Sequence, residues 1–129
     1  MKNKINKVKE FHEAFNIVNA DQPTVKLDGL MDHFLRHRLM EEENDEYLKA
    51  CLDNDLVEIA DALGDQLYIL CGTILKHGMQ HKIAEVFDEI HRSNMSKLDG
   101  NGSPIFREDG KILKGENYFK PNISEILNK

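Results

Sequence analysis

The chain has 129 residues, of which 40% are apolar and 31% are charged, and a formal net charge of −6. This length fits one domain, residues 1–129, with room for a hydrophobic core. The acidic balance argues against DNA or RNA as the main partner, because binding a polyphosphate backbone requires a basic face. It leaves room for a small anion held by a few local cations or by metal ions.

The sequence carries no sign of export or of a membrane anchor. The N-terminal segment MKNKINKVKEFHEAF is basic but lacks the continuous apolar core of a signal peptide. Residues 56–75 are mostly apolar, yet three acids within them argue against a membrane span. Cys51 and Cys71 belong to no metal-binding pattern, so we expect free thiols in a reducing cytoplasm.

Apolar periodicity predicts four helices, separated by breaks rich in Asp, Asn, Gly and Pro. The expected helices cover residues 4–18, 30–51, 55–76 and 81–98. The first places His12 on its apolar face beside Phe15. Core packing is the simpler role for this histidine, and lining a base pocket is the alternative.

The C-terminal region differs from the helical part. Asp109-Gly110 lies between short apolar pairs in residues 105–113, which predicts a tight hairpin turn. Pro121 argues against regular structure in the segment that follows. The predicted class is therefore all-α, a bundle of four to five helices with a short C-terminal hairpin or irregular arm.

The acid run RLMEEENDEY holds two kinds of carboxylate. At about 100° per residue, Glu42 and Glu46 continue the apolar stripe of the second helix, and Glu43 lies beside it. Glu41 and Asp45 point elsewhere, so we expect them in solvent. Three of these carboxylates are therefore aimed at the helix that packs against this one.

The third helix carries its acids on the side opposite its leucine stripe. Glu58, Asp61 and Asp65 are the only charged side chains between Leu56 and Leu75. A helix that is apolar nearly all round is predicted to be buried. Buried carboxylates then need a counter-charge from outside the helix.

The fourth helix ends its apolar stripe in Asn94 and Lys97. Six inward carboxylates on the two preceding helices would repel one another, whereas Mg²⁺ binds oxygen ligands and neutralises them, and Mn²⁺ also suits such ligands. An ammonium and an amide nearby would hold phosphate oxygens. The pattern predicts a metal-dependent site for a phosphorylated small molecule.

Two motifs carry a family resemblance. EENDE has the form EExxE and EIAD has the form ExxD, and on consecutive helices they resemble the all-α nucleoside triphosphate pyrophosphohydrolases. That superfamily includes MazG proteins, phosphoribosyl-ATP pyrophosphohydrolase, and the dimeric dUTPases and dCTPases. DALGDQLYILCGT and HRSNMSKLDGNGSPIFREDGKILKGENYFKP look like the MazG-like branch labelled phosphoribosyl-ATP pyrophosphohydrolase-like, so the resemblance covers nearly the whole chain.

The resemblance implies a MazG-like bundle that hydrolyses a nucleoside triphosphate to monophosphate and pyrophosphate with Mg²⁺. The carboxylates that it assigns to metal and water are Glu42, Glu43, Glu46, Glu58 and Asp61. It also assigns Asn94 and Lys97 to the phosphates and Lys114 and Tyr118 to the nucleotide. Asp65 shares the face of Asp61 and is a further candidate.

Glu43 is the hypothesised general base, because its place at the edge of the carboxylate face lets it reach a water. The resemblance also implies a homodimer or a tetramer of dimers. A deoxynucleotide such as dUTP, hydrolysed in nucleotide-pool house-cleaning, is the expected substrate. Phosphoribosyl-ATP, a non-catalytic Mg²⁺- or nucleotide-binding bundle, and an acidic interaction module stay open as alternatives.

Overall fold

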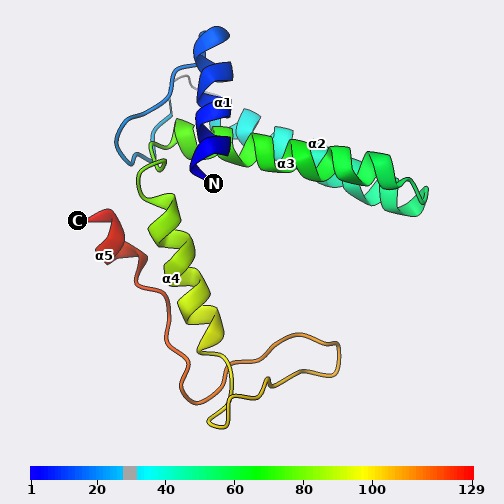
Figure 1. The fold of residues 1–129 in the computed structure, drawn as a ribbon, viewed down its shortest axis with the longest axis vertical. Helices are drawn as coiled ribbons and strands as arrows, with labels where there is room; N and C mark the ends of the chain where they lie inside the picture. The colour runs from blue at the N-terminus through cyan, green and yellow to red at the C-terminus, as the bar shows by residue number, and fades with distance from the viewer. Residues whose placement is uncertain (28–31) are drawn as a thin grey trace. The chain divides into compact units, whose positions relative to one another are not determined.

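The computed structural model describes residues 1–27 and 32–129, and its regular structure is helical (Figure 1). The helices are α1 (Lys2–Ala14), α2 (Asp32–Leu52), α3 (Leu56–Lys76), α4 (Ile83–Met95) and α5 (Ile123–Leu127). The predicted all-α class is confirmed, while the expected start of the second helix at residue 30 lies outside the described residues. No helix in these two ranges is long and apolar enough to cross a membrane.

The chain divides into two compact units, residues 1–81 and residues 82–129. In the first unit, α2 and α3 pack along their length as a helical hairpin, and α1 packs against α3 (Figure 1). The second unit holds α4, α5 and the irregular arm between them. The expectation of a single domain over residues 1–129 stays a prediction.

Helices α1 and α2 end where an asparagine adopts a left-handed backbone. Asn16 has φ 59°, and the backbone N–H of Ile17 donates to His12 O at 2.8 Å. Asn54 has φ 53° in the same arrangement, with Asp55 N–H donating to Ala50 O. Both are Schellman endings, in which a left-handed residue satisfies the last carbonyls. This is why α1 stops at Ala14 and not near residue 18 as predicted.

Asp55 also starts the next helix. Its side chain accepts a hydrogen bond from the backbone N–H of Glu58 at 3.1 Å, which caps the N-terminus of α3. Three residues, 53–55, therefore reverse the chain between α2 and α3, within the segment LDND that predicted the break.

The core of the first unit lies where α1 crosses the hairpin. Ile5 and Val8 of α1 are buried there with Cys71 and Leu75 of α3. His12 is buried on the same face with 2% exposure, as its place on the apolar stripe predicted. Phe15 is 65% exposed, because the helix ends before it.

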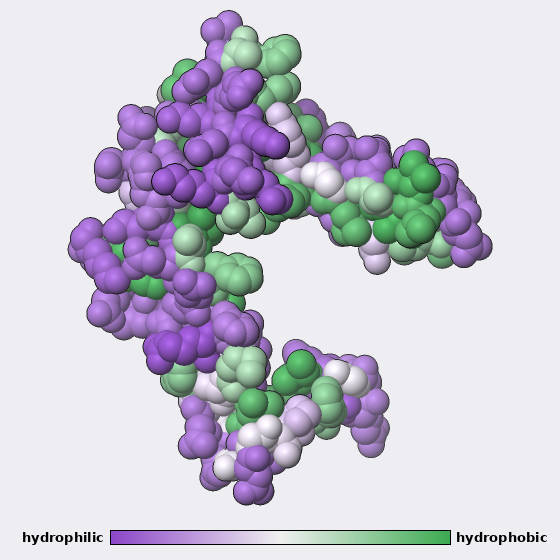
Figure 2. Space-filling model, in the orientation of Figure 1, coloured by the Kyte–Doolittle hydropathy of each residue, from purple (hydrophilic) through white to green (hydrophobic). Residues whose placement is uncertain are grey.

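The far end of the hairpin is not covered within this chain. The predicted burial of α3 all round is wrong for the single chain, since Leu56 is 77% exposed, Leu63 51% and Leu70 45%. The acid-bearing side of α3 packs on α2 instead, with Ala62 buried. Figure 2 shows hydrophobic side chains at the surface over this end of the hairpin.

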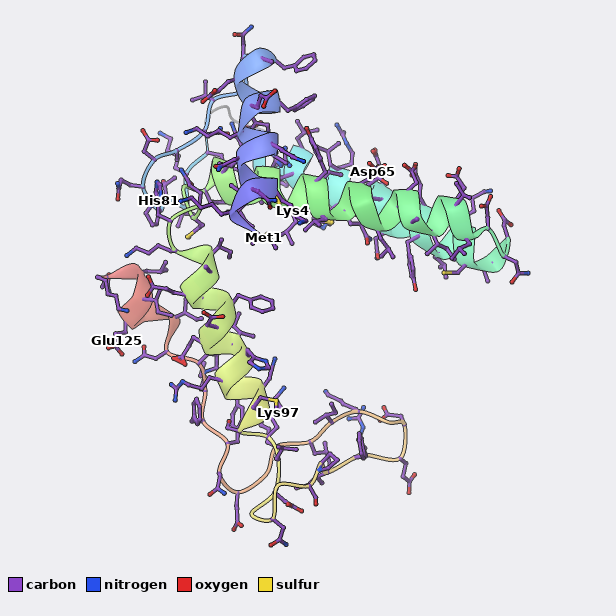
Figure 3. All side chains as sticks on the ribbon, in the orientation of Figure 1. Met1, Lys4, Asp65, His81, Lys97 and Glu125 are labelled. Atoms are coloured by element: carbon purple, nitrogen blue, oxygen red, sulfur yellow. The ribbon has the colours of Figure 1, made fainter. Side chains whose placement is uncertain are left out.

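In the second unit, α4 ends at Met95 and not near residue 98 as predicted. The arm crosses the end of the helix, where Ser96 Oγ accepts from Phe119 N–H at 3.1 Å and Ser93 Oγ donates to Phe119 O at 2.8 Å. Lys97 therefore lies in the turn after α4, as Figure 3 also shows, and not on a helical stripe.

The predicted hairpin exists as a tight turn, and it forms no sheet. Phe106 and Ile112 form an isolated antiparallel bridge, and Arg107 N–H donates to Lys111 O at 2.8 Å. Gly110 has φ 87°, which places the left-handed residue of a three-residue loop at the predicted Asp109-Gly110.

The short helix α5 begins two residues after Pro121. Asn122 accepts from the backbone N–H of Glu125 at 3.3 Å, and its amide donates back to the Glu125 carboxylate at 3.1 Å. This reciprocal capping allows a helix of one turn to form where the proline alone predicted irregular structure.

Candidate functional site

Four carboxylates gather between α2 and α3. Glu43 and Glu46 are one turn apart on α2, and Asp61 and Asp65 are one turn apart on α3. Burial, and then the charges of Asp65, Glu46 and Asp61, raise the pKa of Glu43 to about 7 from an ordinary 4.5. Burial and the charges of Asp61 and Glu46 also raise the pKa of Asp65. The charges of the neighbouring carboxylates thus make ionisation of Glu43 and of Asp65 less favourable.

Glu43 lies at the centre of this carboxylate cluster. It is half-buried, and its Oε2 atom is inaccessible and without a hydrogen-bond partner. A buried carboxylate oxygen without a partner is unfavourable unless something supplies a donor or a positive charge. In residues 1–27 and 32–129, none of the four carboxylates forms an ion pair. The cluster therefore lacks its counter-charge.

The chemistry of the cluster fits a hard divalent cation. Carboxylate oxygens are the ligands that Mg²⁺ and Mn²⁺ take in proteins, and the unpartnered Oε2 of Glu43 is such a ligand. In the described part of the chain, however, no three acidic, histidine or cysteine side chains stand close enough together to hold an ion. Metal binding would therefore require these side chains to rotate toward one another. Their backbones lie on two helices, α2 and α3, that pack against each other.

The inward face of α2 differs from the predicted stripe. Arg36, Glu43 and Ala50 are half-buried or buried along it, each seven residues after the last, as in the seam of two packed helices. Glu42 is exposed instead, with its Oε1 atom 4.0 Å from Arg38 Nε. A strict 100° step placed the centre of the face one residue too early, because packed helices follow a seven-residue seam.

The remaining carboxylates lie at the margin of the cluster. Glu58 is exposed in the first turn of α3 and lines an open hollow of about 330 Å³ together with Glu46 and Lys49. Glu41 and Asp45 are exposed, as predicted. The roles of Glu42 and Glu58 as metal ligands stay predictions.

The phosphate and nucleotide candidates belong to the second unit. Asn94 is exposed in the last turn of α4, and Lys97 is half-buried in the turn that follows. Lys114 Nζ lies 4.7 Å from the centre of the Tyr118 ring, a cation–π contact. Figure 3 labels Lys97 just beyond α4 and Asp65 midway along α3. Whether these groups meet the carboxylates stays a prediction.

Arg36, a cation on the same seam, was not predicted from the sequence. Its Nε atom donates to Thr73 Oγ1 at 3.0 Å and its Nη2 atom to Ile69 O at 2.7 Å. The signal in the sequence was its place seven residues before Glu43, whereas the space that Gly72 leaves for its long side chain is visible only in the structure.

Comparisons with known proteins agree with the all-α fold and with the position of the carboxylates in the sequence. Residues 8–94 match a family model described as Phosphoribosyl-ATP pyrophosphohydrolase, a range that holds every predicted carboxylate and ends at Asn94. A crystal structure described as a "putative NTP pyrophosphohydrolase" from Exiguobacterium sp. 255-15 is 27% identical. The match covers 98% of this chain and 94% of that one, with a TM-score of 0.53. The comparison with curated proteins found no match.

Proposed function

Since the chain belongs to the phosphoribosyl-ATP pyrophosphohydrolase family of MazG-like all-α proteins, we propose that it hydrolyses a nucleoside triphosphate to the monophosphate and pyrophosphate. One observation carries this proposal. Glu43 has a buried, unpartnered carboxylate oxygen among three further acids, with no counter-charge in the described parts of the chain. A cluster of this kind suits metal ions and the phosphates that come with them.

The cluster residues would hold Mg²⁺, with Mn²⁺ as a substitute. Glu43 and Glu46 would approach from α2 and Asp61 from α3, Asp65 stands one turn further along α3, and Glu42 and Glu58 complete the predicted set. When bound, the ion supplies the positive charge that neutralises the phosphate oxygens.

Glu43 would act as the general base. Its place within the carboxylate cluster would let it accept a proton from a water beside the metal. The water oxygen forms a bond to phosphorus while the bond between the α-phosphate and pyrophosphate breaks. The water proton moves to the Glu43 carboxylate, and pyrophosphate leaves with the displaced oxygen.

Groups of the second unit would bind the rest of the substrate. The Lys97 ammonium and the Asn94 amide would donate to phosphate oxygens, and Lys114 and Tyr118 would contact the nucleotide. The support is chemical, since these are the donor types that phosphates require.

A second copy of the chain would complete the structure as a homodimer or a tetramer of dimers. Leu56, Leu63 and Leu70 expose an apolar face on α3, and Phe87 (67%) and Ile90 (41%) expose one on α4. Apolar faces of this kind mark interaction surfaces in proteins that remain in solution. A partner copy would also bring further cations toward the site. Light scattering after gel filtration tests this, and a monomer at micromolar concentration would refute it.

The proposed substrate is a deoxynucleoside triphosphate such as dUTP, in nucleotide-pool house-cleaning. The two free cysteines, Cys51 and Cys71, are in keeping with a reducing cytoplasm. Phosphoribosyl-ATP is the second candidate, favoured by the description of the family model.

The test is a panel of nucleoside triphosphates and phosphoribosyl-ATP, incubated with the protein and Mg²⁺. Chromatography should show monophosphate and pyrophosphate in equal amounts, lost with chelator and with Glu43→Gln, and kept with Glu41→Gln. Tight binding without turnover would instead favour a nucleotide sensor. No binding and no effect of Mg²⁺ on thermal stability would favour an interaction module.

A further inference from the structure

The first unit contains an apolar pocket of about 310 Å³ beside the carboxylate cluster, and none of the cluster residues lines it. Its polar end contains Arg36, seven residues before Glu43 on the seam of α2, or about 10 Å along the helix. Ile69 of its wall lies one turn after Asp65 on α3. The pocket and the carboxylates therefore occupy successive stretches of the same seam.

The pocket wall suits a flat ring. Phe11 of α1 and Tyr68 of α3 both line it, with ring centres 5.7 Å apart and planes at 82°. The rest of the wall is largely aliphatic, including Leu35 and Leu39. Aromatic edges and faces bind planar heterocycles well.

His12 supplies a hydrogen-bond acceptor at the polar end. It is 2% exposed, and its Nδ1 atom lies 2.6 Å from Asn19 Oδ1. Because Asn19 Oδ1 only accepts, Nδ1 carries the proton and Nε2 keeps its lone pair. Burial first, and then the charges of Arg36 and Lys76, lower the pKa of His12, although the Asn19 contact opposes them. The ring is therefore neutral near pH 7.

Arg36 supplies donors next to this acceptor. Its contacts with Thr73 and Ile69 fix the guanidinium and use only two of its five N–H groups. In the described residues it forms no ion pair, whereas Lys76 is paired with Asp32 at 2.8 Å. Arg36 thus retains both its charge and free donors.

Gly72 allows the two groups to meet. A Cβ atom at this position would lie 2.7 Å from Arg36 Nη2 and 3.0 Å from His12 Nε2. Both nitrogens therefore approach one point, and no hydrogen bond joins them among the described contacts. Lys76 and Asp32 also line the pocket, but they are paired with each other at 2.8 Å, which leaves His12 Nε2 as an acceptor beside the Arg36 donors.

We propose that this pocket binds the base of the nucleotide and selects bases with an HN–C=O edge, through His12 Nε2 and the Arg36 guanidinium. The inference rests on the proposed function and adds the substrate class. The base N–H would donate to His12, and its carbonyl oxygen would accept from Arg36. Uracil, thymine, guanine and hypoxanthine present this edge. Held in the same orientation, cytosine and adenine present a ring acceptor to His12 and an amino donor to Arg36, which leaves both pairs unsatisfied.

The first experiment uses the unmodified protein with Mg²⁺. We expect kcat/KM for dUTP to exceed that for dCTP by at least about 100-fold. The kcat/KM for dGTP should likewise exceed that for dATP. Equal hydrolysis of all four would overturn this inference and leave the proposed function intact. A preference for dCTP and dATP would also overturn it.

The second experiment measures binding of dUMP and dCMP by calorimetry in the presence of a chelator. We expect dUMP to bind at least about 10-fold more tightly than dCMP, because the base edge is read without metal. If no triphosphate is hydrolysed but dUMP is still preferred, the proposed function fails and this inference stands.

The variant His12→Phe keeps a ring and removes the acceptor. The preference for dUMP over dCMP should fall to within about threefold, while His33→Phe, an exposed histidine of α2 outside the pocket, should keep it. An unchanged preference in folded His12→Phe would overturn the assignment. If that variant does not fold, the dUTP to dCTP ratio of the unmodified protein decides.

Discussion

The seam between α2 and α3 holds charged side chains in two regions. In one region the charged group is hydrogen-bonded, and in the other it is left without a partner. At the end near α1, the Arg36 guanidinium bonds neutral groups, Thr73 Oγ1 and Ile69 O. Seven residues further along α2, Glu43 lies among other acids and its Oε2 atom has no partner. Pairing charge with opposite charge would be the simplest arrangement for stability. Keeping Arg36 and Glu43 apart favours a ligand with two different ends. One end carries neutral polar groups and would bind at Arg36, and the other is a phosphate chain with metal ions that would bind at Glu43.

This comparison predicts that a substitution in one region changes the function of that region alone. One region should govern metal binding and the chemical step, and the other should govern which base is accepted. Variants that alter only one of these properties would sharpen the comparison, and variants that alter both would break it.

The largest effect is expected from Glu46→Ala and Asp61→Ala. Each removes one carboxylate of the cluster, so turnover should fall at least about 1,000-fold, in the range seen when one electrostatic contact to the transition state is removed. The rise in melting temperature with millimolar Mg²⁺ should disappear as well. Kinetics and thermal unfolding with and without chelator measure both.

Glu41→Ala is the matched control, because Glu41 is exposed on the same helix. It should remain near the unmodified protein in both assays. Damage equal to that of Glu42→Ala would place the start of the EExxE motif one residue earlier.

Arg36→Lys should affect the other region. Lysine keeps the charge but loses the planar fork that bonds Thr73 and Ile69 while donating to a base. We expect kcat/KM for dUTP to fall about 100-fold, with the Mg²⁺-induced rise in melting temperature kept. Arg38→Lys, at an exposed position two residues later, is the control. Loss of the Mg²⁺ response in folded Arg36→Lys would show that the regions are not separable.

Lys97→Ala tests whether the second unit completes the phosphate site. If Lys97 contacts phosphate, the contact strengthens as pyrophosphate departs, so binding and rate should both fall by ~2–3 kcal/mol in transition-state terms. Lys114→Ala, whose ammonium lies over the Tyr118 ring, offers a comparison with a weaker candidate. Steady-state kinetics on folded protein with the best triphosphate measures both. A kcat/KM within twofold of the unmodified protein would remove Lys97 from the site.

The parts of the fold that follow local rules were predictable from the sequence. The reversal at Asp55 and the turn at Asp109-Gly110 appear where capping and turn chemistry place them. The end of α1 at Asn16 and the start of α5 at Asn122 carried equally local signals, which apolar periodicity and Pro121 obscured.

The parts that depend on packing were less predictable. Periodicity alone gives the inward face of α2 to within about one residue, which is why Glu42 and not Glu43 headed the predicted stripe. Arg36 was missed because a lone arginine on a helix gives no sign that Gly72 of another helix leaves room for it. The exposed Leu56 and Leu63 show that an apolar pattern indicates burial without saying which chain provides the cover.

The smallest effect concerns the stability of the metal-free protein and its dependence on pH. The pKa of Glu43 is about 7 in the folded protein and 4.5 ordinarily, so folding disfavours its ionised form. Below about pH 4.5 the group is protonated in both states and has no effect. Between pH 4.5 and 7 the unfolded chain releases the proton first, and the folded state loses stability progressively. Above pH 7 the loss is complete and constant.

Glu43→Gln should therefore stabilise the metal-free protein at pH 8, and the gain should vanish near pH 4.5. Because Glu43 is only half-buried, solvent screening limits the gain to about 1 kcal/mol. With Mg²⁺ the unmodified protein should instead be the more stable of the two. It is stabilised by the bound ion, whereas the variant has lost one of the ligands for that ion. Urea unfolding at both pH values, with chelator and then with Mg²⁺, measures all three effects, and Glu41→Gln serves as the exposed control. Destabilisation of Glu43→Gln by the same amount at pH 4.5 and pH 8 would show that Glu43 is a packing residue, and the carboxylate cluster would then lose its centre.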